Sequence, residues 1–223
     1  MTGALRPVVA AAAALASTIA WGDALPGPKS LDFDRTFDAR GEPASVHYRA
    51  RYTLAGQAHE VEVWRDGAER LKRRTDGRFE TYVTRPKGEA EWQMVVLDLH
   101  RRLRTDVART NLYRIGNFSD WFGLANSLSR PSGGYMLVAA AGAPSVNENP
   151  IAACKWYTLT RSGVASKVCW SRAERVPLMV ADRDGHVQWR IVAIDRAAPA
   201  AATFAMHDDG FVRNDANRDI QAD

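Results

Sequence analysis

Regular alternation of apolar and polar side chains, interrupted by short turns, is the feature that most restricts the folds open to this chain. Val46–Leu54 alternates throughout, and Val61 and Val63 fall on one face of the next predicted strand. Successive side chains of a strand point to opposite faces, so this period of two indicates strands with one buried face. Hairpin signals follow at Asp66-Gly67 and Asp76-Gly77. Turns that recur at intervals of about 10 residues predict an antiparallel meander.

The predicted strands fall into two groups with one helical interval between them. The first group covers residues 46–54, 59–64, 69–74, 79–84, 92–99 and 100–105, and the second covers 153–160, 165–172, 176–181, 186–195 and 203–206. In the interval, Trp121, Leu124, Ala125 and Leu128 recur at the spacing of one helix face, and Ser119 is the expected N-cap. We therefore expect a helix over residues 119–130, followed by a long loop over 131–150.

Residues 1–22 have the pattern of a secretory signal peptide. Arg6 supplies the positive start, Pro7–Trp21 is the apolar run, and the small residues Ala20 and Gly22 suit a cleavage before Asp23. The run is shorter than the roughly 20 residues of a spanning helix, which argues against a membrane anchor. A buried helix is the other alternative.

The whole chain has the composition of an ordinary globular protein. Charged residues make up 25% and hydrophobic residues 46%, which argues against disorder, collagen or a coiled coil for the whole chain. It contains no second apolar run of spanning length, so we expect an exported protein of a bacterial periplasm without an integral membrane span. We expect one domain over residues 23–212 and a polar, flexible tail over 213–223.

The basic residues do not form the stripe that is typical of nucleic-acid binding. The net charge is only +4, and acidic residues interrupt most basic runs, so we expect no nucleic-acid partner. Two stretches are denser, and on strands their alternate side chains share a face. These could meet anionic lipid headgroups or an acidic partner, or they could form a solvated outer sheet face. The two stretches contain Arg70, Lys72, Arg73, Arg74, His100, Arg101, Arg102 and Arg104.

The two cysteines are too few for a disulfide scaffold or a four-cysteine zinc site, but export would place them in an oxidising compartment. Cys154 and Cys169 lie on predicted strands, and a turn centred on Ser162 places them directly opposite each other. We therefore predict one structural disulfide, because a redox pair would require a close CxxC spacing. This register assigns Tyr157, Leu159, Val168 and Trp170 to the inward face, and Cys154, Trp156, Lys167 and Cys169 to the other.

Motifs of catalysis and metal binding are absent from the sequence. The five histidines form no HxxxH or HExxH pair, and there is no GxSxG, glycine-rich phosphate loop or Cys–His arrangement. Asp215, Asn217 and Asp219 alternate as in a calcium loop, but Ile220 stands where that loop needs glycine. We expect no enzymatic activity, no cofactor and no metal, although a hydrolase with an unrecognised site stays a third alternative.

The aromatic residues suggest a cavity for an apolar ligand. Six of the seven tryptophans follow the leader, and a curved meander with one apolar helix can leave its interior incompletely filled. Such a cavity suits an acyl chain, because burial gains about 0.8 kcal/mol per CH₂. Core packing is the alternative interpretation. The residues predicted to line the cavity are Trp92, Met94, Trp121, Leu124, Leu128, Tyr157, Trp170 and Trp189.

The order of these features resembles the LolA/LolB-like superfamily of periplasmic lipoprotein and lipid carriers. A leader, a meander, a helical interruption and a cysteine hairpin precede the segment VPLMVADRDGHVQWRIVAIDRAAPAAATFAMHDDGF. In that family a Pro-Leu strand and a long return strand precede a Phe near a Pro-x-Gly turn. Val176-Pro177-Leu178, Val187–Asp195 and Phe204 match these features, and Asp209-Gly210-Phe211 replaces the turn without its proline. The resemblance covers residues 45–212.

The resemblance implies a mainly β (α+β) fold, in which a curved antiparallel incomplete β-barrel carries a helical lid over an apolar cavity. It also implies a periplasmic carrier or binding protein for a lipid or a lipoprotein acyl chain, with a role in outer membrane biogenesis. The alternative is an envelope interaction or stress-sensing module that binds a protein partner without a small-molecule cargo. The loop over 131–150 and the disulfide hairpin depart from the family pattern.

Overall fold

The computed structural model describes residues 29–37, 45–89, 91–108, 120–141 and 143–216. The predicted signal peptide and the predicted N-cap Ser119 lie outside these residues. The helices are α1 (Phe33–Thr36), α3 (Trp121–Asn126) and the 3-10 helix η1 (Ala201–Phe204). The strands are β1 (Ser45–Leu54), β2 (Gln57–Asp66), β3 (Arg70–Thr75), β4 (Phe79–Thr84), β5 (Gln93–Asp98), β6 (Leu103–Ala108), β7 (Tyr135–Ala139), β8 (Lys155–Arg161), β9 (Val164–Ser171), β10 (Val176–Ala181), β11 (Val187–Asp195) and β12 (Val212–Asp215).

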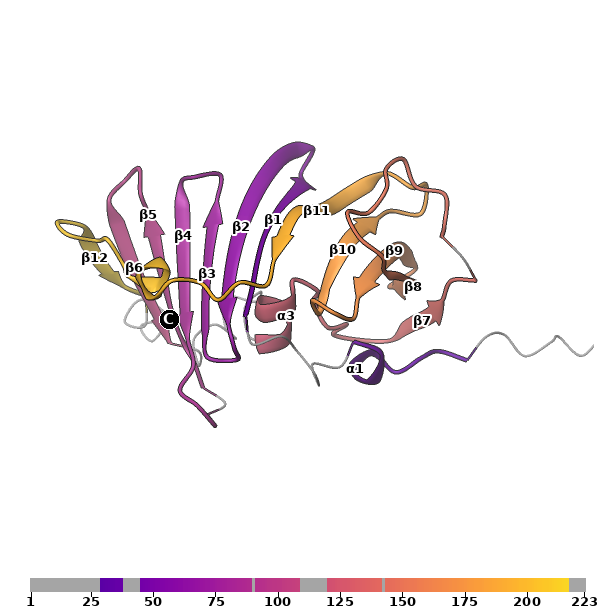
Figure 1. Ribbon diagram of the computed structural model, residues 1–223, viewed down its shortest axis with the longest axis horizontal. Coiled ribbons are helices and arrows are strands. Elements are labelled where there is room, and N and C mark those ends of the chain that lie inside the picture. The colour runs from indigo at the N-terminus through magenta and orange to yellow at the C-terminus, as the bar shows by residue number, and fades with distance from the viewer. Residues whose placement is uncertain (1–28, 38–44, 90, 109–119, 142, 217–223) are drawn as a thin grey trace, which may run out of the picture.

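All described strands belong to one curved, open sheet. The twelve strands follow the order β12-β6-β5-β4-β3-β2-β1-β11-β10-β9-β8-β7, so within the described residues β12 and β7 form its two edges. Neighbours pair antiparallel except for β12, which runs parallel to β6. In Figure 1 the strands from β6 to β1 stand side by side, and β10, β9 and β8 curl round beyond β11. The predicted mainly β, incomplete-barrel architecture with few helices is confirmed.

Tight turns set the register of the meander. Leu54 pairs with Gln57, so Ala55 and Gly56 alone form the first turn, with φ of 50° and 78°. Positive φ at both central residues defines the type I′ turn, whose twist matches that of paired strands. The predicted strand boundaries over 46–84 agree with β1–β4 within about two residues, as expected when turn chemistry and alternation coincide.

The cysteine hairpin forms, but with a register that differs from the prediction. Arg161 pairs with Val164 and Trp156 pairs with Cys169, so the turn consists of Ser162 and Gly163. Both turn residues have positive φ, and this two-residue turn shifts the pairing by two positions. Cys154 therefore lies diagonally from Cys169 rather than opposite it, and the disulfide forms across a Cα–Cα distance of 5.4 Å. The disulfide prediction is confirmed.

The hydrophobic core consists of two clusters. The larger contains Tyr48, Val61 and Val63, which define what we call the inner face of the sheet, and it includes Leu124 of α3. The smaller surrounds Phe37, Tyr157 and Trp170. Trp170 belongs to one cluster and its neighbour Cys169 to the other, and both are fully buried. Both faces of the cysteine hairpin are therefore covered, whereas the sequence indicated only one.

The helix over 119–130 is shorter than predicted. It begins at Trp121 after the N-cap Asp120, whose carboxylate accepts hydrogen bonds from the backbone N–H groups of Phe122 and Gly123. It ends at Asn126 because Ser127 is left-handed, with φ of 54°, and its N–H donates to the Gly123 carbonyl. The Ser127 hydroxyl lies 2.6 Å from the Tyr48 hydroxyl, and this contact ties the end of the helix to β1.

The C-terminal part departs most from expectation. The predicted strand over 203–206 is wrong, because Ala201–Phe204 forms η1. Residues 196–211, which we call the strap, run from β11 across β1–β6 to β12 (Figure 1). β12 spans Val212–Asp215, so the predicted boundary between the domain (23–212) and the tail (213–223) falls inside this strand. The predicted loop over 131–150 also contains a strand, β7, which pairs with β8.

Candidate functional site

Partly exposed aromatic side chains form a chain of contacts on the inner face. The ring centroid of Trp189 lies 6.3 Å from that of Tyr48 and 6.1 Å from that of Tyr52. The ring of His59 stacks on that of Tyr52, with 5.2 Å between their centroids. We call Tyr48, Tyr52, His59 and Trp189 the aromatic group. Tyr48 is buried, but the other three keep part of their surface accessible. Flat rings of this kind bind apolar or aromatic ligands with little loss of side-chain entropy.

Two of these side chains are held in place by hydrogen bonds. The Trp189 Nε1–H donates to the Pro177 carbonyl at 2.9 Å, and His59 Nδ1 lies 2.7 Å from Asp76 Oδ2. Asp76 Oδ1 also accepts from the Glu60 backbone N–H. The hydrogen bond to His59 and that to Glu60 hold the pKa of the Asp76 carboxyl below its usual range. The rings of His59 and Trp189 are therefore oriented before any ligand arrives.

Arg73 adds one cation to the inner face. It pairs across the strands with the buried Val63 and with Thr81, which places its half-buried side chain on the same face. Val63 pairs in turn with Tyr48, so Arg73 and Tyr48 are in register on neighbouring sides of β2. Burial raises the pKa of the Tyr48 and Tyr52 hydroxyls, and the positive charge of Arg73 opposes this in both cases. Within the described residues Arg73 has no acidic partner. A half-buried cation without a counter-ion is costly, and an acidic ligand group would relieve that cost.

Helix α3 is fixed on the inner face by a fully buried arginine. Arg65 Nη1 donates to the Ala125 carbonyl at 3.0 Å and to Asn126 Oδ1 at 2.7 Å, and Nη2 donates to the Glu174 carbonyl at 3.3 Å. These acceptors lie at the end of α3 and in the turn before β10. Arg65 therefore joins the sheet, the helix and that turn at one point.

The structure distributes the eight predicted cavity residues between the two clusters. Trp92, Met94, Trp121, Leu124 and Trp189 belong to or pack against the larger cluster, and Leu128, Tyr157 and Trp170 belong to the smaller one. Trp92 and Trp121 are brought together, with centroids 5.8 Å apart. Only Trp121 and Trp189 keep appreciable exposed surface. Whether any of the eight contacts a ligand stays a prediction.

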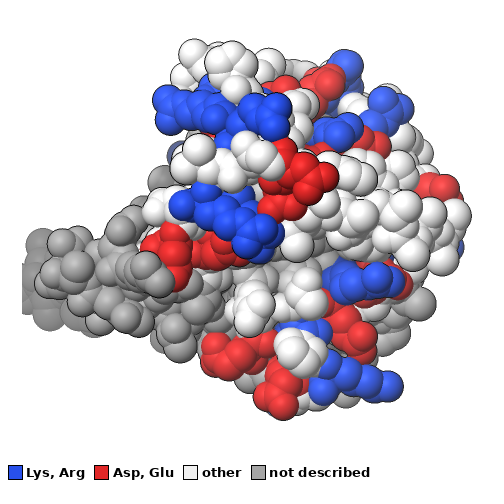
Figure 2. Space-filling view, turned by 90° about the vertical axis from the view of Figure 1, so that its left-hand side faces the viewer, with Lys and Arg blue, Asp and Glu red and all other residues white. Residues whose placement is uncertain are grey.

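The basic strand segments are neutralised by neighbours. Arg70 pairs with Asp66, Lys72 and Arg74 pair with Glu80, and Arg104 pairs with Asp106 and Asp208. Arg101 Nε lies 3.9 Å from Asp98 Oδ2. Figure 2, which views the β12 end, shows basic and acidic side chains interleaved. The outer face at this end of the sheet is therefore a mixed-charge surface. Among the basic residues of β3, Arg73 alone has its side chain on the inner face.

One pocket of about 230 Å³ lies on the outer face and is lined by residues of β1, β2, β3 and β11 and of the turn after β3. Arg49, Arg51 and Arg74 line it, but so do Glu60, Glu62 and Asp76. Because opposite charges balance there, the pocket shows no preference for an ion of either sign. None of the eight predicted cavity residues lines it.

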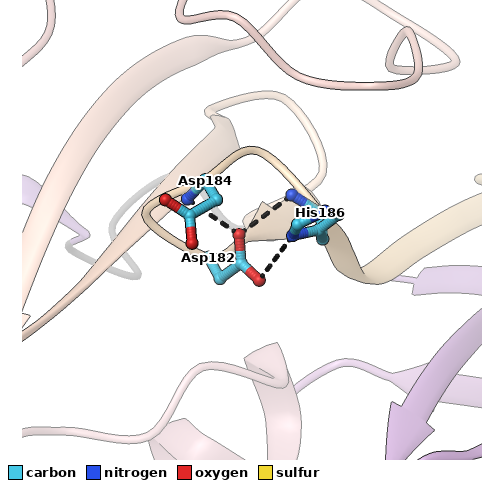
Figure 3. A group of neighbouring side chains, drawn as sticks. All are labelled: Asp182, Asp184 and His186. Atoms are coloured by element: carbon cyan, nitrogen blue, oxygen red, sulfur yellow. Dashed lines mark hydrogen bonds and ion pairs between the residues drawn. The ribbon is translucent and has the colours of Figure 1, made fainter.

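Asp182, Asp184 and His186 bring potential ligand atoms within 4.8 Å of one another. As Figure 3 shows, Asp182 Oδ1 accepts from the backbone N–H groups of Asp184 and His186, and its Oδ2 contacts His186 Nδ1. Burial raises the pKa of Asp182, but these hydrogen bonds prevail and keep it below its usual range. The carboxylate is already occupied in stabilising the turn before β11.

Sequence reasoning identified Trp189 but missed Tyr52 and Arg73. Alternation alone contained the signal, because Tyr52 shares the parity of Tyr48 on β1, and Arg73 shares that of Leu71 on β3. A charged residue at an inward position was interpreted as part of a solvated basic run. Only the register of β1, β2 and β3, which the sequence does not give, places Arg73 in line with Tyr48.

Comparison with known proteins gives no family assignment. No family model matches the sequence, and no curated protein matches it. Among solved structures, MucB is 15% identical with a TM-score of 0.40, over 77% of this chain and 60% of that chain. The Pseudomonas aeruginosa MucA/MucB complex gives 15% identity and a TM-score of 0.42, over 80% and 62%. PNGF-II gives 5% identity and a TM-score of 0.42, over 79% and 33%.

These TM-scores are too low to assign a family or a function. The chain also spans less than two thirds of the length of each of these structures. Membership of the LolA/LolB-like superfamily therefore stays a prediction. In the part of the chain that the structure describes, no helix has the length and apolar character needed to cross a membrane.

Proposed function

We propose that this protein is an exported, periplasmic binding protein that holds an apolar ligand on the inner face of its sheet, without chemical turnover. The observation that carries the proposal is the position of Arg73 beside the aromatic group, with no acidic partner among the described residues. The rings would contact the apolar part of the ligand, and Arg73 would contact an acidic group at its end. The disulfide supports an oxidising compartment such as the periplasm.

The proposed binding site differs in position from the cavity that the sequence predicts. Trp92, Met94 and Leu124 of α3 are buried in the larger cluster, whereas Tyr52 and Trp189 are partly accessible. The ligand would therefore lie beside the helix, against β1, β2, β3 and β11. Helix α3 would bound the site at one end, because Ser127 contacts Tyr48 there.

Titration with 11-(dansylamino)undecanoate, an apolar chain with one carboxylate, tests the proposal. We expect Arg73→Gln and Tyr52→Ser each to weaken binding by about fivefold or more, because each removes a contact worth about 1 kcal/mol. Arg49→Gln is the matched control, since Arg49 is an exposed arginine on the outer face. Equal affinity for all four proteins would overturn the site.

A second experiment separates a ligand carrier from an interaction module. Native mass spectrometry of protein purified from periplasm should detect a bound small molecule, and Tyr52→Ser should reduce its occupancy. Recovery of ligand-free protein crosslinked in stoichiometric amounts to another envelope protein would instead favour the interaction module and overturn the carrier.

A further inference from the structure

Asp-Gly pairs occur four times in the sequence, as Asp66-Gly67, Asp76-Gly77, Asp184-Gly185 and Asp209-Gly210. In such a pair the glycine nitrogen can attack the side chain of the aspartate before it, because glycine has no Cβ that would hinder the approach. The reaction requires a carboxyl group that is free to move and an N–H that is not committed to a hydrogen bond. The contacts of the four pairs therefore decide which of them can react in the folded protein.

The first two pairs have their carboxylates engaged by neighbours. Asp66 Oδ2 accepts a hydrogen bond from Arg70 Nε at 3.1 Å. Asp76 Oδ1 accepts from the Glu60 backbone N–H at 2.8 Å, and its Oδ2 lies 2.7 Å from His59 Nδ1. Both carboxylates must leave these partners before they can react.

The pair at Asp184 is restrained at its glycine instead. The Gly185 N–H donates to the Asp182 carbonyl at 3.3 Å, and the Gly185 carbonyl accepts from the Asn147 N–H at 3.2 Å. Gly185 is also buried, and a Cβ there would lie 2.7 Å from the Ser145 carbonyl oxygen. The nitrogen that would attack is therefore engaged, in a turn that is packed against a second loop.

Asp209-Gly210, near the end of the strap, has neither restraint. Both residues are exposed, and among the residues described nothing pairs with the Asp209 carboxylate or with the Gly210 N–H. The surrounding backbone is held nevertheless, because Arg102 Nη2 donates to the Asp209 carbonyl at 2.8 Å and the Phe211 N–H donates to the Asp208 carbonyl at 3.0 Å. Two reactive groups are therefore adjacent and free within a defined turn.

We propose that Asp209 is a site of spontaneous conversion to isoaspartate, and that this modification releases the strap from the sheet. The Gly210 nitrogen bonds to Cγ of the protonated Asp209 side chain, and the carboxyl hydroxyl leaves as water with the proton of the nitrogen. Water then opens the resulting succinimide at the backbone carbonyl, so that the chain continues through Cγ and gains one CH₂. The reaction uses only water and the two residues themselves.

The added CH₂ lengthens the turn that fastens the strap to the sheet. No residue of the strap is buried, so a few polar contacts decide whether this segment stays docked. The contacts next to the turn are the ion pair of Asp208 with Arg104 at 2.7 Å, the Phe211 ring 5.5 Å from the Arg102 guanidinium, and the hydrogen bond from the Val212 N–H to the Arg102 carbonyl at 2.9 Å. A longer backbone cannot keep all three in register.

Prolonged warm incubation of the full-length protein at neutral pH, followed by tryptic peptide mapping, tests this site. Trypsin releases residues 197–213, which contain Asp209-Gly210 and no other Asp-Gly pair. In ¹⁸O-labelled water each ring opening adds one heavy oxygen to this peptide. We expect isoaspartate to form there about tenfold faster than at the other three pairs, whose hydrogen bonds must open first. In guanidinium chloride, which removes the folded contacts, all four pairs should convert at similar rates.

Matched variants and hydrogen exchange test the location and the consequence. Asp209→Glu keeps the charge but disfavours ring closure, so it should abolish the signal, whereas Asp184→Glu should leave it unchanged. In the aged protein, residues 203–215 should show a second, faster-exchanging population whose share equals the isoaspartate share, while β1 and β2 stay unchanged. Conversion at Asp209 no faster than at the other pairs of the folded protein would overturn the site. Unchanged exchange of the strap in the converted protein would overturn its release.

Discussion

Glu80 is the most enclosed carboxylate of the outer face, and the strap covers it. Its carboxylate lies 3.1 Å from Lys72 Nζ and 2.8 Å from Arg74 Nη2, and it accepts from the Tyr82 hydroxyl at 2.6 Å. Tyr82 also donates to the Ala205 carbonyl of the strap. Burial raises the pKa of Glu80, but the hydrogen bonds from Tyr82 and Lys72 outweigh it and lower the pKa below 4.5. The ionised carboxylate is thus part of the folded structure.

Glu80→Gln should reduce the free energy of unfolding by about 3 kcal/mol, because it leaves Lys72 buried without its counter-charge. Urea denaturation at neutral pH measures this. Glu62→Gln, which disturbs a more exposed pair with His47, should cost less than about 1 kcal/mol. Equal effects of the two substitutions would contradict the assignment.

The same pair of proteins should show a defined pH dependence. A pKa that is lowered by folding contributes stability above the unfolded value, and this contribution is lost as pH falls through the folded value. The difference in unfolding free energy between wild type and Glu80→Gln should therefore be constant near neutral pH and shrink below about pH 4.5. A difference that grows on acidification would exclude this role for Glu80.

Individual residues show where sequence reasoning ends. Alternation correctly placed Val61 and Val63 on one face, and it also places Arg65 there, fully buried. A single sequence gives no reason to bury an arginine, because its acceptors lie about 60 and 109 residues away in the chain. Only the fold brings the end of α3 and the turn before β10 to this side chain.

At the scale of elements, short-range signals succeeded and long-range pairings failed. The Asp-Gly turns and the turn at Ser162 predicted the hairpins, but β7 and β12 were missed because neither has an alternating pattern of sufficient length. β12 in particular is mostly exposed, and its partner β6 precedes it by more than a hundred residues. Helix α3 was overextended because its apolar spacing continues to Leu128, beyond the left-handed Ser127.

Arg65→Met should loosen α3 more than the rest of the sheet. The substitution keeps much of the apolar side chain and removes the donors to Ala125, Asn126 and Glu174, at a cost of about 3 kcal/mol. Hydrogen exchange should accelerate first at the amides of residues 122–127. An equal acceleration in β1 and β2 would show instead that Arg65 stabilises the whole domain uniformly.

The disulfide should stabilise the second half of the sheet. It closes a loop with a sequence separation of 15, for which chain entropy predicts about 3 kcal/mol. Reduction should therefore lower the urea midpoint of the wild-type protein, whereas a Cys154→Ser/Cys169→Ser double variant should not respond to reductant. Identical midpoints for the oxidised and reduced wild type would contradict this role.

The described strands form one continuous sheet that carries two hydrophobic clusters, which cover opposite faces of the cysteine hairpin. Because Cys169 and Trp170 connect the clusters through one strand, neither can lose its packing without disturbing the other. A single domain over residues 23–212 stays a prediction.

Unfolding should therefore occur in one cooperative transition. Leu178→Ala in the larger cluster and Leu137→Ala in the smaller one each remove a fully buried side chain, at a cost of about 3 kcal/mol. Both should shift the same midpoint, whether followed by tryptophan fluorescence or by far-UV circular dichroism. Two separate transitions, with one substitution acting on each, would show that the clusters unfold independently.

The edges of the sheet have a practical consequence for handling the protein. Ser30 and Leu31 bond to the β7 edge at Leu137, and β12 covers the β6 edge. Shortened versions that begin after residue 31 or stop before residue 212 would leave unpaired strand edges, which promote association between chains. Purification tags, fluorophores and crystallisation truncations are therefore better introduced at the exposed turn Pro86-Lys87-Gly88 than next to either covering segment.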